Sequence, residues 1–410
     1  MNANRGDYLC ITPFFPSENE VFGSYVYDQI VAIKKLNIFN RIIVVKPGSL
    51  RSAQHSYEYK GIHVYLCPSV HLPSNLFNGI FNELNEDLFN RFLKKIGLNC
   101  SNIAVVHTHT ANCAFYAIAI KKLNAKALTM VQHHDGDPYG IRNARFSGWR
   151  RNVRYKAAKN AEVFSQIDVH ICISRFVERH LKEFPAINDI DYAEDYRNAL
   201  HRVQGIKGAE IKKSIILHNG VDTNIFVPGV SETGKDSRKF TIGCVAHFQK
   251  IKGHMTILKA LRILRDEYGH EHIKVRFVGS GPTWEECRTF VSLHNLAESV
   301  SFKKEVQHEE LVTFYQSLDL YVMPSYYEGF GCVYLEAAAC GVPFMACEGQ
   351  GIEDYIPESE KSMWLCKPEN AAQLAHMIHV YITDKPKQNL SNPISIECLV
   401  EHCFSELNRI

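Results

Sequence analysis

The chain has 410 residues, which is more than one ordinary α/β domain contains, so its length predicts two domains. Its residues are 46% apolar and 22% charged, with a formal net charge of +2, which is typical of a soluble globular enzyme and does not indicate nucleic-acid binding. The first residues lack the layout of a secretory signal, and no apolar run is long enough to cross a bilayer, so we expect a cytoplasmic protein.

Short apolar runs alternate with helical patterns through the first half of the chain. In the first helical pattern, Val26, Ile30 and Ile33 fall on one face. The apolar runs are unbroken, as in strands buried on both faces of a parallel sheet that is covered by helices. These predicted strands are 8–12, 42–45, 63–67, 104–106, 128–131, 169–173 and 215–217.

A polar segment rich in small residues, 228–239, separates this series from a second one and is interpreted as a linker. The clearest helices of the second series are predicted at 254–265 and 371–381, with Asn370 as the N-cap of the latter. Its predicted strands are 241–245, 274–278, 300–302, 320–323, 343–346 and 363–366.

The two series predict an α/β protein with two Rossmann-like domains, each a doubly wound parallel sheet. We place the N-terminal domain at 1–230 and the C-terminal domain at 238–393, and we expect a helix in 394–410 to pack back on the N-terminal domain. Because ligands of such sheets bind at the carboxyl ends of the strands, the site is expected in a central cleft that the two domains face.

The segment 325–343, SYYEGFGCVYLEAAACGVP, directly follows a predicted strand and contains the residues best suited to bind a ligand. Gly329 and Gly331 let the backbone approach a ligand closely, and the amides of the following helix favour an anion such as a diphosphate. On that helix, Glu336 is placed to accept hydrogen bonds from a ribose diol. Glu328, in the preceding loop, is free to contact a sugar.

This segment matches the E-x7-E signature of the large family of retaining glycosyltransferases called family 4, whose fold is GT-B. Further pieces of the chain resemble that family in the expected order and cover nearly its whole length. They are Phe22-Gly23-Ser24, His107-Thr108-His109, His133-His134-Asp135, Ile173-Ser174-Arg175, His218-Asn219-Gly220-Val221-Asp222, Lys252-Gly253 and Phe277-Val278-Gly279-Ser280-Gly281-Pro282.

The resemblance implies transfer of a sugar from a nucleotide-diphosphate sugar to a hydroxyl acceptor with retained anomeric configuration, in glycan or polysaccharide biosynthesis. It implies that Lys252 neutralises the departing diphosphate, that Glu328 binds the donor sugar, and that His134, or alternatively His133, lies near the anomeric carbon. The implied donor-binding residues are Gly23, His247, Gly279, Gly281, Gly329, Phe330, Gly331 and Glu336. Those implied for the acceptor or the cleft are His109, His133, Ser174 and Asn219.

The resemblance implies no cofactor and no metal, since helix amides and basic side chains would replace the cation. The 13 cysteines occur singly, without a C-x-x-C pair, and are expected to be reduced thiols. Two positions depart from the family: His247 replaces an arginine and Lys304 replaces a glycine. Gln350 stands in a segment that is usually G-G-I-P-E, and 184–212 is a long polar insertion.

Each of these residues also has a purely structural interpretation. Lys252 could be a solvated lysine, Gly279 and Gly281 could be turn formers, and His109 could cap a loop. Two functional alternatives are a non-catalytic partner that binds sugar nucleotides, and an epimerase or hydrolase of sugar nucleotides. A dehydrogenase is disfavoured because no G-x-G-x-x-G follows the first predicted strand.

The segment from Arg142 to Lys159 is strongly basic and includes two aromatic residues, Phe146 and Trp149. One hypothesis is that it rests on an anionic membrane, at the inner face, and brings the enzyme to a lipid-linked acceptor. The alternative is an ordinary solvated helix face.

Overall fold

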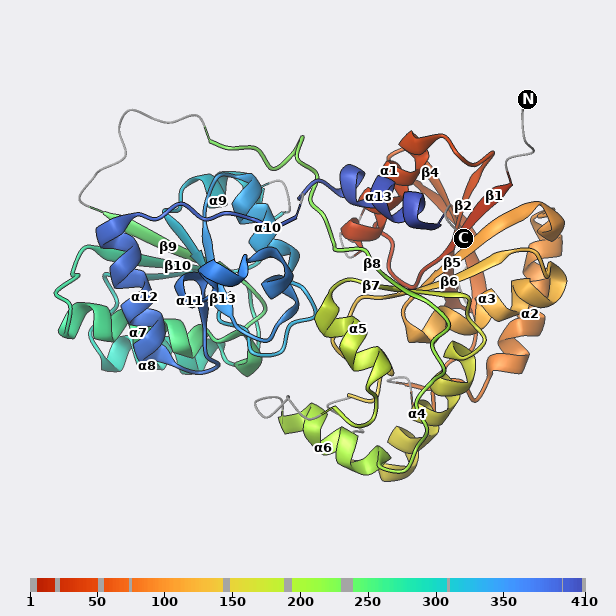
Figure 1. Cartoon of the computed structure of the whole chain (residues 1–410), viewed down its shortest axis with the longest axis horizontal. Helices are drawn as coiled ribbons and strands as arrows, with labels where there is room; N and C mark the ends of the chain where they lie inside the picture. The colour runs from red at the N-terminus through yellow and green to blue at the C-terminus, as the bar shows by residue number, and fades with distance from the viewer. Residues whose placement is uncertain are drawn as a thin grey trace. The chain divides into compact units, whose positions relative to one another are not determined.

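The computed structural model describes residues 6–18, 23–50, 55–73, 76–142, 148–187, 194–229, 239–307, 310–392 and 394–407. The chain divides into two compact units (Figure 1). Unit 1 contains Met1–Asn219 and Ile396–Ile410, and unit 2 contains Gly220–Ser395. The division therefore lies inside the Asn219-Gly220 motif rather than in the polar segment 228–239, of which 230–238 are outside the described residues.

Unit 1 is built on an eight-stranded sheet with the order β3-β4-β2-β1-β5-β6-β7-β8 in its described residues. Neighbouring strands are parallel except for the antiparallel pair β3 and β4. The strands are β1 (Asp7–Ile11), β2 (Ile42–Ser49), β3 (Ser56–Tyr59), β4 (Ile62–Ser69), β5 (Ile103–His109), β6 (Leu128–His133), β7 (Val169–Cys172) and β8 (Ser214–Ile216). The sequence did not predict β3, because this edge strand is only partly buried and lacks an apolar run.

The helices of unit 1 cover this sheet. Val26, Ile30 and Ile33 are at most 1% exposed, which confirms the predicted inner face of the first helix. The insertion 184–212 contains a helix whose Tyr196 and Leu200 are buried, and this helix contacts α4. The helices are α1 (Ser24–Leu36), α2 (Asn82–Lys95), α3 (Ala114–Leu123), α4 (Arg150–Phe164), α5 (Arg175–Lys182) and α6 (Glu194–Val203).

The C-terminal helix α13 (Ile396–Leu407) belongs to unit 1, where it lies beside α1 (Figure 1). Its apolar residues recur at helical spacing and join the hydrophobic core that contains Tyr8 of the central strand. Within this core, Phe404 lies near the rings of Tyr8 and Phe39, with centroid distances of 6.3 and 5.8 Å. Burial of this apolar stripe explains why the end of the chain packs with its beginning.

Unit 2 has a six-stranded parallel sheet with the order β11-β10-β9-β12-β13-β14 in its described part. Its strands are β9 (Phe240–Val245), β10 (Ile273–Val278), β11 (Val300–Lys303), β12 (Leu320–Val322), β13 (Phe344–Cys347) and β14 (Leu365–Cys366). Its helices are α7 (His254–Asp266), α8 (Trp284–Leu293), α9 (Glu310–Gln316), α10 (Cys332–Ala339), α11 (Lys361–Trp364) and α12 (Ala371–Asp384).

One capping prediction and one strand prediction in unit 2 have different outcomes. Asn370 caps α12, since its side chain accepts a hydrogen bond from the Gln373 amide at 2.9 Å. The strand predicted at 363–366 is wrong in its first half, because Trp364 ends the short helix α11. The indole of Trp364 donates to Glu360, one helical turn earlier, at 3.2 Å, and this bond favours helical backbone there.

No helix in the described parts of either unit is long and apolar enough to cross a membrane.

We predict that Phe404→Ala lowers the free energy of unfolding of unit 1 by about 3 kcal/mol, since it opens a cavity in the core that α13 shares with β1 and α1. Urea unfolding of the full chain measures this change. Glu401→Ala, at an exposed position of the same helix, is the matched control and should change stability by less than about 0.5 kcal/mol. Equal midpoints for the two variants would contradict the packing of α13 in this core.

Candidate functional site

Lys252 and Glu328 come together at the carboxyl ends of two neighbouring strands of unit 2. Lys252 ends a short 3-10 turn after β9, and Glu328 lies in the loop after β12. The Lys252 ammonium donates a hydrogen bond to the Glu328 carboxylate and forms an ion pair with it. The side chains of Lys252 and Glu328 are 21% and 16% exposed. Because the charges are partly shielded from water, they attract each other more strongly than an ion pair in bulk water would.

The loops that carry these two residues are also joined through the backbone. The Tyr326 amide donates to the carbonyl oxygen of Ile251 at 3.0 Å. Gly253 has a φ of +74°, and a Cβ there would lie 2.4 Å from the carbonyl oxygen of Pro324. The glycine of the Lys252-Gly253 pair is therefore required by the close approach of the loop after β12.

The backbone structure also explains why positions 279 and 281 are glycine. They adopt φ values of +141° and +148°, and a Cβ on Gly279 would lie 2.1 Å from the carbonyl oxygen of Ala246. Between them, the carbonyl oxygen of Ser280 accepts a hydrogen bond from the Phe248 amide at 2.7 Å. This turn thus packs its backbone directly against the loop that leads to Lys252, and the nucleotide contact of the two glycines stays a prediction.

Glu336 lies on the inner side of α10, where it is 8% exposed. One oxygen of its carboxylate accepts a hydrogen bond from the Tyr315 hydroxyl at 2.7 Å, which fixes the side chain. Gly331, with a φ of +83°, directly precedes this helix, and a Cβ there would lie 2.7 Å from the ring of Tyr334. Phe330 is 1% exposed and packs against Tyr355, so its side chain belongs to the core.

Gln350 positions Glu328, a role that the sequence did not reveal. Its side-chain oxygen accepts a hydrogen bond from the Glu328 amide at 2.8 Å, and the carbonyl oxygen of Glu328 accepts one from the Gly351 amide at 3.1 Å. Both backbone groups of Glu328 are therefore held by one short segment. A lone glutamine carries no sequence signal for such a contact, because it depends on two loops meeting.

Other residues of the donor and hinge motifs make fewer contacts within the protein. His247 and Lys304, the two residues that differ from the family pattern, are exposed. Asn219 is partly exposed at the end of unit 1. In the same motif, the Asp222 side chain accepts a hydrogen bond from the Asn224 amide at 2.9 Å, and therefore shapes the turn.

In unit 1, the predicted histidines cluster around the carboxyl ends of β5 and β6. His109 and His134 stack with ring planes 8° apart, and the Nδ1 of His109 lies 2.8 Å from the Nε2 of His134. Burial lowers the pKa of His134 to about 3, so the ring is neutral near pH 7. His134 can therefore act through hydrogen bonds but not as a cation.

His133 belongs to a different hydrogen-bonded chain. The Nε2 of His170 donates to the carbonyl oxygen of Phe164 at 3.1 Å, so the Nδ1 of His170 accepts from the Nε2 of His133, also at 3.1 Å. His133 is 2% exposed, while His134 is partly exposed. This difference favours His134 over His133 as the residue that meets a ligand.

Two more predicted residues of unit 1 serve as helix starts. Ser174 is fully buried and accepts a hydrogen bond from the Val177 amide at 3.2 Å, which caps α5. Gly23 precedes α1 with a φ of +95°, and a Cβ there would lie 2.6 Å from the carbonyl oxygen of Phe14. Phe22, the first residue of its motif, lies outside the described residues.

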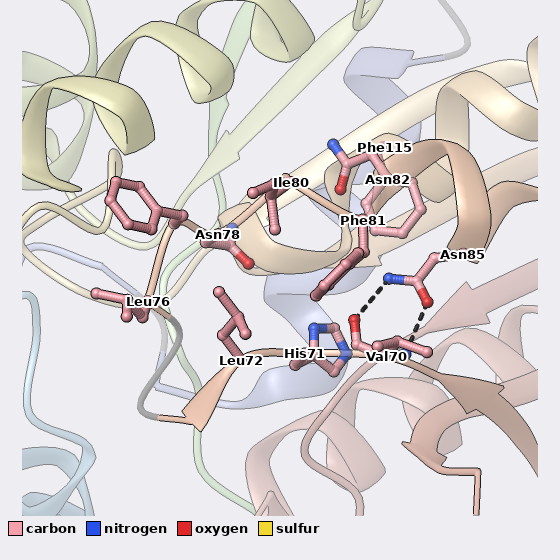
Figure 2. Close-up of a pocket in the computed structure, with 12 residues that line it drawn as sticks. Val70, His71, Leu72, Leu76, Asn78, Ile80, Phe81, Asn82, Asn85 and Phe115 are labelled. Atoms are coloured by element: carbon pink, nitrogen blue, oxygen red, sulfur yellow. Dashed lines mark hydrogen bonds between the residues drawn. The ribbon is translucent and has the colours of Figure 1, made fainter. Parts of the chain in front are cut away.

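His134 lines a cavity of about 390 Å³ that lies within unit 1. Tyr25 borders the same cavity, with its ring centroid 4.8 Å from that of His134. Four charged residues also belong to the lining: Asp135, Asp137, Arg142 and Lys156. A second hollow in unit 1 is lined by 70–72 and 76–82 together with Asn85 and Phe115, and it holds only about 10 Å³, too little for a sugar. In Figure 2, the side chain of Asn85 on α2 accepts a hydrogen bond from the Val70 amide and donates one to the Val70 carbonyl oxygen, at the edge of this hollow.

The basic segment from Arg142 to Lys159 is largely engaged within the chain. Arg154 donates to the carbonyl oxygens of Arg202 and Gln204, and Lys159 pairs with Glu162. Arg150 and Arg151 are exposed next to Trp149, which is 54% exposed. Residues 143–147 are outside the described part of the chain.

Two family models match the chain in sequence order. "Glycosyltransferase Family 4" matches residues 23–190, and "Glycosyl transferases group 1" matches residues 230–392. The chain belongs to glycosyltransferase family 4. Membership explains why each unit has its own parallel sheet and why candidate residues lie at the strand ends of both.

Solved structures share the fold over the whole chain. Sucrose-phosphate synthase from Thermosynechococcus elongatus superposes with a TM-score of 0.71 and 16% identity, covering 99% of both chains. Anabaena HepE, solved with UDP and glucose, gives a TM-score of 0.65 and 15% identity over 99% of this chain and 100% of that one. These likenesses confirm the predicted GT-B fold.

Among curated proteins, the chain is similar to a D-inositol 3-phosphate glycosyltransferase from Arthrobacter sp., with 29% identity over 40% of this chain and 41% of that protein. It is also similar to a GDP-mannose-dependent phosphatidylinositol monomannoside mannosyltransferase from Mycolicibacterium smegmatis, with 30% identity over 33% of this chain and 39% of that protein. The chain thus spans about two fifths of the length of these relatives.

We predict that Gly279→Ala lowers the free energy of unfolding of unit 2 by about 3 kcal/mol or more, because the new Cβ collides with the backbone at Ala246. Thermal and urea unfolding measure the effect. Gly269→Ala is the control, since Gly269 also has a positive φ of +73° but open space around it, and should cost only about 1 kcal/mol. Similar losses for both variants would mean that strain and not the collision sets the requirement for glycine.

Proposed function

We propose that the chain is a retaining glycosyltransferase that moves a sugar from a nucleotide-diphosphate sugar to a hydroxyl acceptor. The observation that carries this proposal is the Lys252–Glu328 pair at the carboxyl ends of β9 and β12, in the same loop system as the N-terminus of α10. Family membership and the sugar-transferring relatives support it.

In this proposal, unit 2 binds the donor. Lys252 meets the diphosphate and stabilises the negative charge that grows as the sugar departs, together with the first amides of α10. Glu336, held by Tyr315, accepts hydrogen bonds from the ribose, and Glu328 binds the donor sugar. Since Glu328 already pairs with Lys252, the diphosphate gives the ammonium a second anionic partner when the donor arrives.

Unit 1 supplies the acceptor side of the reaction. His134 borders the cavity of unit 1 and is neutral near pH 7, so it is suited to hydrogen-bond a sugar hydroxyl close to the reacting carbon. After the diphosphate departs, the acceptor hydroxyl attacks the same face of the sugar, which retains the anomeric configuration. The basic side chains and helix amides take the place of a metal ion in this scheme. HepE, solved with UDP and glucose, supports a nucleotide sugar as the donor class.

We predict that Glu336→Ala weakens donor binding by about 1–3 kcal/mol through lost hydrogen bonds, and that Lys252→Ala lowers turnover by about two orders of magnitude. A thermal-shift panel of UDP, GDP, ADP and their sugars identifies the donor, and calorimetry then measures its affinity for each variant. Lys259→Ala, an exposed position on α7, is the control and should behave as the parent chain.

Four results would contradict the assigned roles or the proposed activity. Unchanged donor affinity in Glu336→Ala removes the ribose assignment, and normal turnover in Lys252→Ala removes the leaving-group assignment. Donor binding without turnover over many acceptors favours the non-catalytic alternative. Release of free nucleotide without any acceptor favours an epimerase or hydrolase.

We further propose that the exposed Arg150 and Arg151 beside Trp149 provide a peripheral contact with anionic membranes, where a lipid-linked acceptor would be found. Co-sedimentation with vesicles of anionic lipid at low salt should retain the parent chain and release the Arg150→Ala/Arg151→Ala double variant. Vesicles of neutral lipid are the control. Absence of binding to anionic vesicles leaves the solvated helix face as the explanation.

A further inference from the structure

Lys156 is a buried cation without a partner in the cavity of unit 1. It is 4% exposed and lines the cavity, yet it makes no hydrogen bond and no ion pair within 4.0 Å in the described chain. An ammonium group held in this way is unfavourable, because it loses part of its water without gaining an acceptor from the protein. Burial accordingly lowers its pKa, and the charge of Asp137 opposes that shift.

The helix that carries Lys156 shows that this arrangement is specific. Asn152, Lys156 and Asn160 follow one another at intervals of four residues on the buried face of α4. Asn152 accepts a hydrogen bond from the Phe77 amide at 2.7 Å, and Asn160 donates to the carbonyl oxygen of Tyr139 at 2.7 Å. Each asparagine is bonded to the backbone through one side-chain atom, although the Nδ2 of Asn152 is buried without a partner in the described chain. The lysine between them lines the cavity.

None of the described acidic residues around the cavity forms an ion pair with Lys156, and the charge of Asp137 compensates it only in part. The Arg142 guanidinium pairs with Asp195 at 2.6 Å, and Asp135 is exposed. Asp137 is 6% exposed, and one of its carboxylate oxygens accepts a hydrogen bond from the Arg142 amide at 2.5 Å. Burial and the nearby Asp135 raise the pKa of Asp137 to about 7, so this carboxyl is partly protonated near neutral pH.

We propose that the cavity of unit 1 binds the acceptor through an anionic group, a phosphate or a carboxylate, for which Lys156 is the counter-charge. The volume of about 390 Å³ lies in the range of pockets that bind small molecules. His134 and Tyr25 line the same cavity, so an acceptor anchored on Lys156 has its hydroxyl groups close to the histidine assigned to the reaction. The inference rests on the proposed function and names the class of its acceptor.

The inference is tested by measuring the binding of candidate acceptor sugars in the absence of the donor. Calorimetry on the full chain compares glucose 6-phosphate and glucuronate with uncharged glucose. We expect at least one of the two anionic sugars to bind at least tenfold more tightly than glucose, and to bind less tightly as salt is raised. A preference for the phosphate or for the carboxylate identifies which anion the acceptor carries. Equal binding of all three sugars, or no binding of any, would overturn the inference.

Lys156→Met removes the charge and keeps the length of the side chain. We expect it to lower the affinity for the anionic sugar at least tenfold, while Lys156→Arg retains most of it. Lys159→Met, which removes a lysine paired with Glu162 on the same helix, is the matched control and should bind like the parent chain.

The melting temperature separates this role from a structural one. Removal of an uncompensated buried charge relieves its desolvation, so Lys156→Met should melt at the same temperature as the parent chain or higher. A lower melting temperature with unchanged anion binding would show that Lys156 serves the fold and would overturn the inference. These measurements use no donor, so loss of binding in Lys156→Met supports the subsite even if no transfer activity is found. Transfer to an uncharged acceptor would overturn the subsite and leave the proposed transferase activity intact.

Discussion

The candidate donor site depends on the close backbone approach of three loops at one end of the unit 2 sheet. The loop after β9 carries Lys252, the loop after β12 carries Glu328, and the turn after β10 packs on the first of them. Gly253, Gly279 and Gly281 permit this approach, since any Cβ at these positions would meet a carbonyl oxygen. Without this close approach of the loops, Lys252 and Glu328 would not form their ion pair.

This dependence changes how the glycine-rich motifs are understood. A glycine turn at the end of a strand is commonly explained by a ligand that approaches the backbone closely. Here the backbone of another loop of the same unit approaches the glycines. This packing positions the charged side chains of Lys252 and Glu328, which are the groups proposed to contact the ligand. Gln350 has a comparable effect on Glu328, because it holds the amide of the residue whose carboxylate is needed.

Unit 1 presents a contrasting kind of site. Its polar residues are mostly buried and bonded to one another, as in the pairs His109–His134 and His133–His170. A buried polar network is stable only when its members find partners, and most of these do. At the cavity, several polar atoms of the described chain lack a partner: Thr110 Oγ1, His133 Nδ1, His134 Nδ1 and Asp137 Oδ1. Lys156 adds a cation without an acceptor to this group, and buried polar groups without partners are candidates for contact with a ligand.

The sequence by itself determined the alternation of strands and helices, the Rossmann-like character of both halves and the family, because buried parallel strands appear as unbroken apolar runs and the motifs keep their order. It also placed Glu336, Lys252 and His134 at strand ends or on the following helix. It did not predict β3, the short helix before β14, the role of Gln350 or the isolation of Lys156. Only the tertiary structure decided these. The role of Gln350 and the isolation of Lys156 depend on segments far apart in the chain, and such contacts leave no local periodicity or spacing. β3 and the short helix are local features that an apolar pattern does not reveal, since β3 is only partly buried and the bond from Trp364 to Glu360 favours helical backbone within an apolar run.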